Sequence, residues 1–149
     1  LKIEGRMKSP YYVATAVNAY RLALNKTADI EILKKELNCA SHRPWSTGFY
    51  KGAMKSKDAG EGAYTQDCQF IGVVRSYREN WALVEQRNRF SAGDELEILS
   101  PHSVGKSFIV DKIYDELDEE LNSAVVPMSL VRIYCPFKLT KGDILRRRI

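Results

Sequence analysis

The stretch FIGVVRSYRENWALVEQ, residues 70–86, contains two β-rich runs on either side of a polar turn sequence. Residues 70–77 and 81–86 are rich in β-branched and aromatic side chains, and the Arg-Glu-Asn between them favours a turn. Similar short runs recur downstream, over residues 95–99, 107–114, 124–126 and 130–134. An open sheet of about six strands would expose unpaired edges, so the pattern predicts a small antiparallel β-barrel that is partly open.

Apolar residues of these runs supply a packed interior for the predicted barrel. Those expected to fill it are Phe70, Val73, Val84, Leu96, Ile98, Phe108, Val110, Val131 and Ile133. In pattern the segment is similar to the β-barrel that forms the second domain of translation GTPases, a module that contacts RNA and protein partners. A likeness of fold does not by itself assign a function.

The first 39 residues predict one strand and two helices instead. Residues 1–6 alternate apolar and charged side chains as a short strand does. Ser9 and Pro10 then mark a helix start, because serine is a favoured N-cap and proline suits the first helical position. Apolar spacing predicts helices over residues 11–24 and 30–38. Their apolar stripes are Val13, Val17, Tyr20 and Leu24 in the first helix and Ile30, Leu33 and Leu37 in the second.

Residues 40–66 contain four glycines and one proline and show little apolar periodicity. Such a composition is typical of an extended loop or linker. The fold class is therefore α+β and mainly β, in three parts. We predict a strand-helix-helix segment over residues 1–39, a linker over residues 40–67 and a C-terminal β-barrel domain over residues 68–149.

The composition is that of an ordinary globular protein, with 44% hydrophobic and 28% charged residues. No apolar run approaches the roughly 18 residues of a membrane span, and no secretory signal is visible, so we expect a soluble cytoplasmic protein. The three cysteines, Cys39, Cys68 and Cys135, lack the spacing of a zinc site. We expect them to be small apolar side chains, with no disulfide framework, no metal site and no cofactor in this chain.

The net charge of +4 is unevenly distributed along the chain. Up to residue 67 there are 11 basic and 7 acidic residues, whereas from residue 68 onward there are 12 of each. The basic excess therefore lies before the predicted barrel. Three consecutive arginines, residues 146–148, are expected to form a solvated tail, as most such charge runs do.

Four strings together resemble one known family: KIEGRMKSPYYVATAV (2–17), SHRPWSTGFYKG (41–52), VEQRNRFSAGDELEILSP (84–101) and VRIYCPFKLTKGDILRRR (131–148). They are similar to the C-terminal end of the collagenase-like peptidases, peptidase family U32. The resemblance covers nearly the whole chain. It implies that residues 1–39 are the end of a catalytic TIM-type barrel, and that the chain is a C-terminal piece whose catalytic half lies upstream. In some relatives, upstream cysteines hold an iron-sulfur cluster, and related members serve hydroxylation of RNA bases.

Two pairs of residues are candidates for contact with a substrate. Glu4 and Arg6 stand two apart in the predicted strand, so both would project to one face at the rim of the TIM-type barrel. A structural ion pair is the alternative. His42 and Arg43 lie in the glycine-bounded loop near Trp45, a mixture of rings and cations found in nucleic-acid grooves. Anchoring of the linker onto a neighbouring domain is the alternative there.

The sequence contains no nucleophile motif, no phosphate-binding loop and no metalloprotease motif. We therefore expect this chain alone to lack peptidase activity, and its catalytic residues stay unknown. The first hypothesis is an accessory domain of a U32-family peptidase that positions a protein substrate or partner against the upstream catalytic domain. The second is an RNA-binding accessory module of a U32-type RNA base hydroxylation protein. The third is a purely structural or oligomerising domain.

The apolar face of the first helix lacks the neighbours that it would have in a TIM-type barrel. An uncovered apolar face favours association. We expect a homo-oligomer or docking of this helix onto the β-barrel, through Tyr11, Tyr12, Val13, Val17 and Tyr20.

Limited proteolysis tests the predicted boundary. We expect cleavage between Gly48 and Gln66, because loops rich in small residues are preferred sites of nicking, and a resistant product that begins near Cys68. N-terminal sequencing and mass spectrometry identify the product. A resistant product that keeps the first helix within one uncut chain would contradict the boundary.

Overall fold

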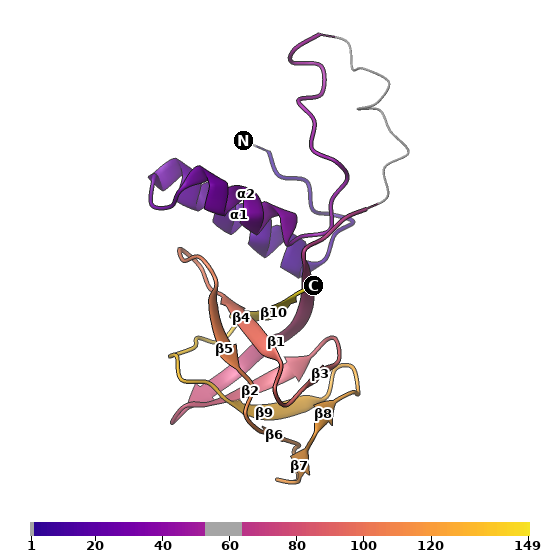
Figure 1. Ribbon diagram of the computed structural model, residues 1–149, viewed down its shortest axis with the longest axis vertical. Helices are drawn as coiled ribbons and strands as arrows, with labels where there is room; N and C mark the ends of the chain where they lie inside the picture. Colours follow the sequence, from indigo (N-terminus) through magenta and orange to yellow (C-terminus); the bar gives the residue numbers. More distant parts are fainter. Residues whose placement is uncertain (1, 53–63) are drawn as a thin grey trace.

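Two helices form a layer against one end of a curled β-sheet in the computed structural model, which describes residues 2–52 and 64–149 (Figure 1). The helices are α1 (Pro10–Asn25) and α2 (Ile30–Asn38). The strands are β1 (Cys68–Arg78), β2 (Trp81–Gln86), β3 (Phe90–Ser91), β4 (Glu95–Leu99), β5 (Lys106–Ile109), β6 (Ile113–Tyr114), β7 (Glu120–Leu121), β8 (Ser123–Ala124), β9 (Leu130–Tyr134) and β10 (Ile144–Arg148).

Both predicted helices are confirmed, and each begins at a capping residue. Ser9 accepts a hydrogen bond from the backbone N–H of Tyr12 (3.2 Å) at the start of α1, and Pro10 occupies the first turn. Asp29 accepts one from the backbone N–H of Glu31 (2.8 Å) at the start of α2. Side-chain acceptors at these positions satisfy N–H groups that have no partner within the helix.

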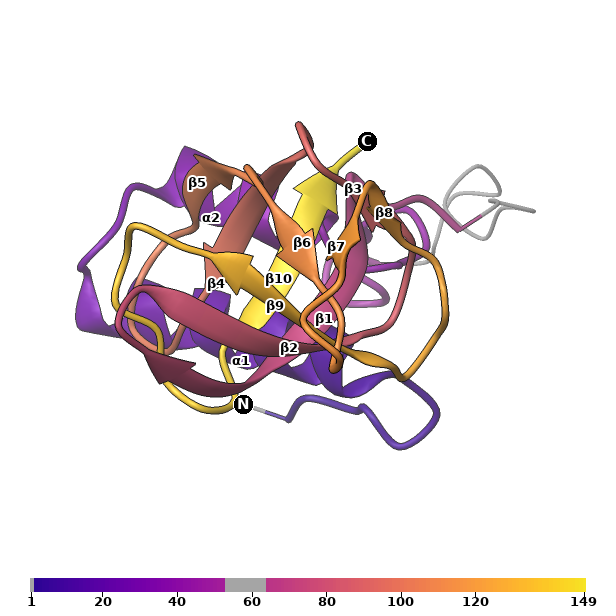
Figure 2. The same ribbon diagram turned by 90° about the horizontal axis from the view of Figure 1, so that it is seen from below.

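Eight strands form one antiparallel sheet in the order β5-β4-β10-β1-β2-β9-β6-β7, and β3 pairs with β8 separately. Figure 2 shows the large sheet curling around its interior. β5 and β7 are its two edges, so the barrel is partly open, and the predicted fold class is confirmed. The sequence underestimated the number of strands. Residues 107–114 divide into β5 and β6, while β3, β7 and β10 were not predicted as separate strands.

The barrel interior contains most of the apolar residues that the sequence predicted, except at β1. There Ile71 and Val74 are fully buried, whereas Phe70 and Val73 are only half-buried. The cause is irregular pairing, since β1 shifts register between Phe70 and Gly72 and again after Val74. Each extra residue in such a bulge reverses the face that the following side chains occupy.

The expectation of a solvated arginine tail was wrong. Residues 144–148 form β10, which lies between β4 and β1 in the sheet, and Arg146 is fully buried. Side chains alternate along a strand, so Arg146 and Arg148 point toward α2 while Arg147 points away from it. This burial is possible because two carboxylates, which lie far from Arg146 in the sequence, pair with its guanidinium.

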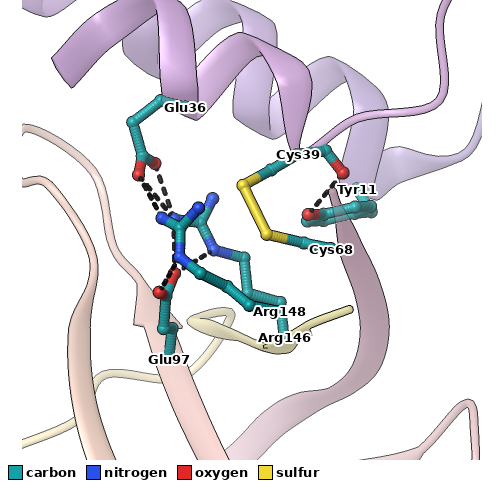
Figure 3. Close-up of a disulfide and its surroundings, with 7 residues drawn as sticks. All are labelled: Tyr11, Glu36, Cys39, Cys68, Glu97, Arg146 and Arg148. Atoms are coloured by element: carbon teal, nitrogen blue, oxygen red, sulfur yellow. Dashed lines mark hydrogen bonds and ion pairs between the residues drawn. A yellow bond between two sulfur atoms is a disulfide. The ribbon is translucent and has the colours of Figure 1, made fainter. Parts of the chain in front are cut away.

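Glu36 of α2 and Glu97 of β4 hold the buried guanidinium of Arg146 from two sides (Figure 3). Its Nη2 lies 2.7 and 2.8 Å from the two carboxylate oxygens of Glu36, and its Nε donates to Glu97 over 2.9 Å. Arg148 bonds to Glu97 as well and lies 3.5 Å from Glu36. These four residues, here called the buried ion cluster, carry two positive and two negative charges.

The surroundings of the cluster fit its charged state. Burial by itself lowers the pKa of Arg146, but the hydrogen bonds and charge of Glu36, together with Tyr11 and Glu97, outweigh burial and raise this pKa above its ordinary value. Gly105 covers the cluster closely. A Cβ atom there would lie 2.9 Å from Arg146 Nη2 and 3.0 Å from Glu97 Oε2, so any larger residue would displace the ion pairs.

Cys39 and Cys68 form a disulfide beside this cluster, which corrects the expectation of three free thiols (Figure 3). Cys39 caps the end of α2 and Cys68 begins β1. Both are fully buried in a small apolar core between the helices and the barrel, together with Tyr11, Leu99 and Ile144. Spacing in the sequence could not reveal this contact, because 29 residues separate the two cysteines.

α1 docks on the barrel, as one of the two expectations for its apolar face stated. Tyr11 stacks on Phe70 with ring centroids 5.3 Å apart, and burial raises the pKa of its hydroxyl. Asn18 donates to the backbone O of Ser103 and accepts from the backbone N–H of His102, both over 2.8 Å. Val17 and Tyr20 stay exposed, as does Leu24 near the end of the helix. Self-association through Val17 and Tyr20 stays a prediction.

The strand expected over residues 1–6 is not formed: within the described ranges, residues 2–6 belong to no strand. A turn follows directly, in which Lys8 donates its backbone N–H to the carbonyl of Gly5 (2.9 Å). A segment whose apolar and charged side chains alternate becomes a strand only when a neighbouring strand hydrogen-bonds to its backbone. None of the described strands lies beside residues 2–6.

Replacing Arg146 tests how much the buried ion cluster contributes. Arg146→Met leaves Glu36 and Glu97, which are 4% and 8% exposed, with only the half-exposed Arg148 as a cation. We expect a loss of about 3 kcal/mol in the free energy of unfolding, because breaking a buried pair leaves uncompensated charge. Urea denaturation measures it.

The matched control is Arg75→Met, which removes an exposed arginine that bonds to Glu85. Its expected loss is below about 1 kcal/mol, as is usual for ion pairs near solvent. Equal losses for the two variants would show that the buried ion cluster contributes no more to the free energy of unfolding than an exposed ion pair does.

Candidate nucleic-acid interface

The loop that follows α2 is held at its base by three links. The Cys39–Cys68 disulfide closes it, and the backbone N–H of Asp67 donates to the carbonyl of Asn38 (2.8 Å). His42 and Thr65 form an antiparallel bridge with two backbone hydrogen bonds of 3.0 Å. These links bring residues 42–45 beside residues 64–66, although the intervening segment is long.

Cationic and aromatic side chains gather where this loop meets the start of α1. Lys8 Nζ lies 5.1 Å from the ring centroid of Tyr12 and 4.4 Å from that of Tyr64. Arg43 also lies over the ring of Tyr64, with its Cζ 5.6 Å from the ring centroid. Such distances permit favourable cation–π contacts, which hold the charged groups near the rings.

His42 and Trp45 extend this group along the loop. Their rings stack with centroids 4.2 Å apart and an interplanar angle of 21°. Trp45 Nε1 donates to Asn38 Oδ1 (2.8 Å), so α2 fixes the indole although its side chain is 57% exposed. We call Lys8, Tyr12, His42, Arg43, Trp45 and Tyr64 the aromatic–cationic cluster.

A pocket of about 250 Å³ opens beside this cluster. It lies between the N-terminal segment, α1 and the loop, and its lining includes Lys2, Glu4, Tyr12, Tyr20, Leu37 and Trp45. Trp45 and Tyr12 belong to both the pocket and the cluster. A mostly apolar pocket with aromatic walls suits a flat ring, and the adjacent cations suit an anionic group.

The structure brings together some of the candidate residues and separates others. Glu4 lines the pocket, where its carboxylate accepts from the backbone N–H of Arg6 (3.1 Å) and lies 4.0 Å from Lys2 Nζ. Arg6 itself is exposed and does not line this pocket. His42 and Arg43 lie in the cluster, as the loop composition indicated. Contact of these four residues with a substrate stays a prediction.

Sequence inspection missed Lys8, Tyr12 and Tyr64 as members of the site. Lys8 and Tyr12 belong to the helix start and Tyr64 to the end of the linker, so no local pattern joins them. The only signal was the basic and aromatic character of each segment. Two further aromatic side chains of this loop, Phe49 and Tyr50, are 79% and 98% exposed.

The described residues do not fit the iron-sulfur cluster that some relatives of the family imply. Cys39 and Cys68 are bonded to each other, and Cys135 is buried in the barrel core. No group of three or more histidine, cysteine or acidic side chains in residues 2–52 and 64–149 could hold a metal ion. Over the same ranges, no helix has both the length and the apolar character needed to cross a membrane.

The architecture defines a class: a small, half-open β-barrel bonded to a helical hairpin, with an aromatic and basic loop between them. Two family models match the chain, peptidase family U32 over residues 1–60 and the peptidase family U32 C-terminal domain over residues 66–146. The chain belongs to peptidase family U32.

The chain is also similar to proteins that are named for tRNA hydroxylation and not for peptidase activity. The chain is 34% identical to tRNA hydroxylation protein P1 of Bacillus subtilis, over 99% of this chain and 37% of that protein. It is 33% identical to tRNA hydroxylation protein P of Escherichia coli, over 68% of this chain and 24% of that protein. The chain therefore spans about a third or less of the length of these relatives.

A crystal structure resembles the barrel part. The C-terminal domain of a U32 peptidase family protein of Geobacillus thermoleovorans is 32% identical and superimposes with a TM-score of 0.51. The match covers 53% of this chain and 99% of that domain.

Counting thiols tests the disulfide at the base of the loop. In denaturant without reductant, we expect an alkylating reagent to add to one cysteine, Cys135, and after reduction to all three. In the folded protein Cys135 should react slowly, because burial raises the pKa of its thiol and the thiolate is the reactive form. Mass spectrometry counts the adducts. Three adducts without reductant would rule out the disulfide.

Proposed function

We propose that this chain supplies an RNA-binding surface to a tRNA hydroxylation protein of the U32 family. The observation that carries the proposal is the aromatic–cationic cluster. The names of the relatives in Bacillus subtilis and Escherichia coli support tRNA as the RNA concerned.

The cluster contains the two kinds of group that single-stranded RNA requires. Exposed rings such as Trp45 and Tyr64 (57% and 55% exposed) offer faces on which bases stack. Lys8 and Arg43 both lie against the ring of Tyr64 and can pair with the phosphates that flank a stacked base. Rings and cations therefore meet on one surface, as in known single-strand binding grooves.

The distribution of charge supports a local site rather than a broad one. The excess of basic residues lies before residue 68, where the cluster forms, whereas the barrel has equal numbers of basic and acidic residues. Several barrel arginines are also occupied by carboxylates, as Arg75 is by Glu85 and Arg132 by Asp118. Phosphate contacts should therefore be few, and binding should depend on stacking as well as on charge.

In this proposal the chain binds and orients RNA and does not itself hydroxylate it. Among the described residues, no group of three or more histidine, cysteine or acidic side chains is placed to hold a metal ion. We assign the chemistry to the parts of the longer relatives that lie outside the aligned segment. The β-barrel then serves as a rigid support, because the disulfide and the buried ion cluster fix both ends of the loop to it.

Binding to a tRNA transcript, measured by fluorescence anisotropy, tests the proposal. We expect affinity to fall about fivefold to tenfold between about 50 mM and about 200 mM salt, since two cations contact phosphate. Trp45→Ala should weaken binding at least about fivefold through lost stacking. Arg43→Ala should weaken binding and reduce the salt dependence.

Two controls remove similar residues from the barrel. Trp81→Ala removes a tryptophan that is 37% exposed on β2, and Arg75→Ala an exposed arginine on β1. Neither should change the affinity. Salt-independent binding, or equal losses for Trp45→Ala and Trp81→Ala, would contradict the proposal. Cleavage of casein or gelatin by the same preparation would contradict the expectation that this chain alone lacks peptidase activity.

A further inference from the structure

A second pocket, of about 300 Å³, adjoins the aromatic–cationic cluster on the side that faces the barrel. Its lining includes Lys8, Tyr12 and Ser41, and a wall of three amide side chains, those of Gln66, Gln69 and Asn88. The lining includes no carboxylate. This pocket is polar, whereas the one beside Trp45 and Leu37 is mainly apolar, so the two pockets suit different parts of a ligand.

The amide groups of the polar pocket are oriented by bonds to the barrel. Gln69 Oε1 accepts from Arg147 Nη2 (2.7 Å), which leaves the Nε2 amide group of Gln69 as a donor. Asn88 Nδ2 donates to the backbone O of Phe70 (2.7 Å), which leaves Asn88 Oδ1 as the acceptor. Neither remaining atom bonds to another side chain in the described part of the chain. The wall therefore offers at least one free donor and one free acceptor.

We propose that this pocket binds one unstacked base of the RNA, whose hydrogen-bonding edge pairs with Gln66, Gln69 and Asn88. The inference rests on the proposed function, since it requires that RNA reach the adjacent cluster. Asparagine and glutamine side chains pair with base edges because each amide places a donor beside an acceptor. Single-stranded RNA is recognised in this way, by bases turned out of the stack.

The position of the pocket gives it a role that the cluster lacks. Tyr12 and Lys8 border both, so a strand whose bases stack on the cluster can place the next base in the pocket. Stacking accepts every base, because every base has a flat face. Hydrogen bonds to an edge discriminate among bases. The cluster therefore supplies affinity, and the pocket supplies base preference.

Short single-stranded homopolymers of uridine, cytidine and adenosine separate these contributions. We expect the unmodified chain to prefer one homopolymer by about tenfold. Gln66→Ala changes an exposed side chain, and it should reduce the preference to about threefold or less. Asn88→Ala should do the same, and circular dichroism with thermal unfolding verifies that both variants fold.

Two further variants provide the comparison. Trp45→Ala should weaken binding to all homopolymers by a similar factor and preserve the preference. Asn122→Ala, an exposed amide that lines neither pocket, should change nothing.

The outcomes distinguish the two proposals. If neither the tRNA transcript nor any homopolymer binds to the unmodified chain at low salt, the proposed function itself fails. If RNA binds and Trp45→Ala weakens it, but the unmodified chain shows no preference or Gln66→Ala and Asn88→Ala keep it, the base pocket is overturned while the proposed function stands.

Discussion

The guanidinium of Arg146, fully buried between a helix and a strand, is the interaction on which the rest of the structure depends. A charge in that position is tolerated only with carboxylates on both sides, because desolvation of an unpaired ion costs several kcal/mol. Glu36 comes from α2 and Glu97 from β4. The two carboxylates come from different units, so both ion pairs form only where the helices and the barrel meet in this relative position.

This fixed position explains how the loop acquires a defined surface. Its two ends, Cys39 and Cys68, lie beside the buried ion cluster and are bonded to each other. Closing a loop of this length removes roughly 3 to 4 kcal/mol of chain entropy from the unfolded state. The rings and cations of the aromatic–cationic cluster therefore stand on a base that the fold has already ordered, which lowers the entropic cost of binding a flexible strand.

Local sequence patterns predicted the helices and several strands of this chain. The predictions failed where the structure depends on a partner far away in the sequence. The helices were predictable because Ser9 caps an N–H group three residues away and because the apolar stripe of Ile30, Leu33 and Leu37 lies within one short segment. The second strand was predictable from residues 81–86 alone. The three arginines at positions 146–148, however, have the sequence pattern of a solvated tail. Their burial depends on Glu36, which lies 110 residues away in the sequence. The same holds for the site: His42 and Arg43 were visible in one loop, whereas Lys8 and Tyr64 join them only through folding.

The two open edges of the sheet bear on how this protein avoids unwanted assembly. β5 has four residues and begins with Lys106, and β7 has only two and begins with Glu120. An approaching foreign strand would find few backbone groups to pair with and a charged side chain at each edge. The barrel can thus stay open without offering a long unpaired edge to a second chain.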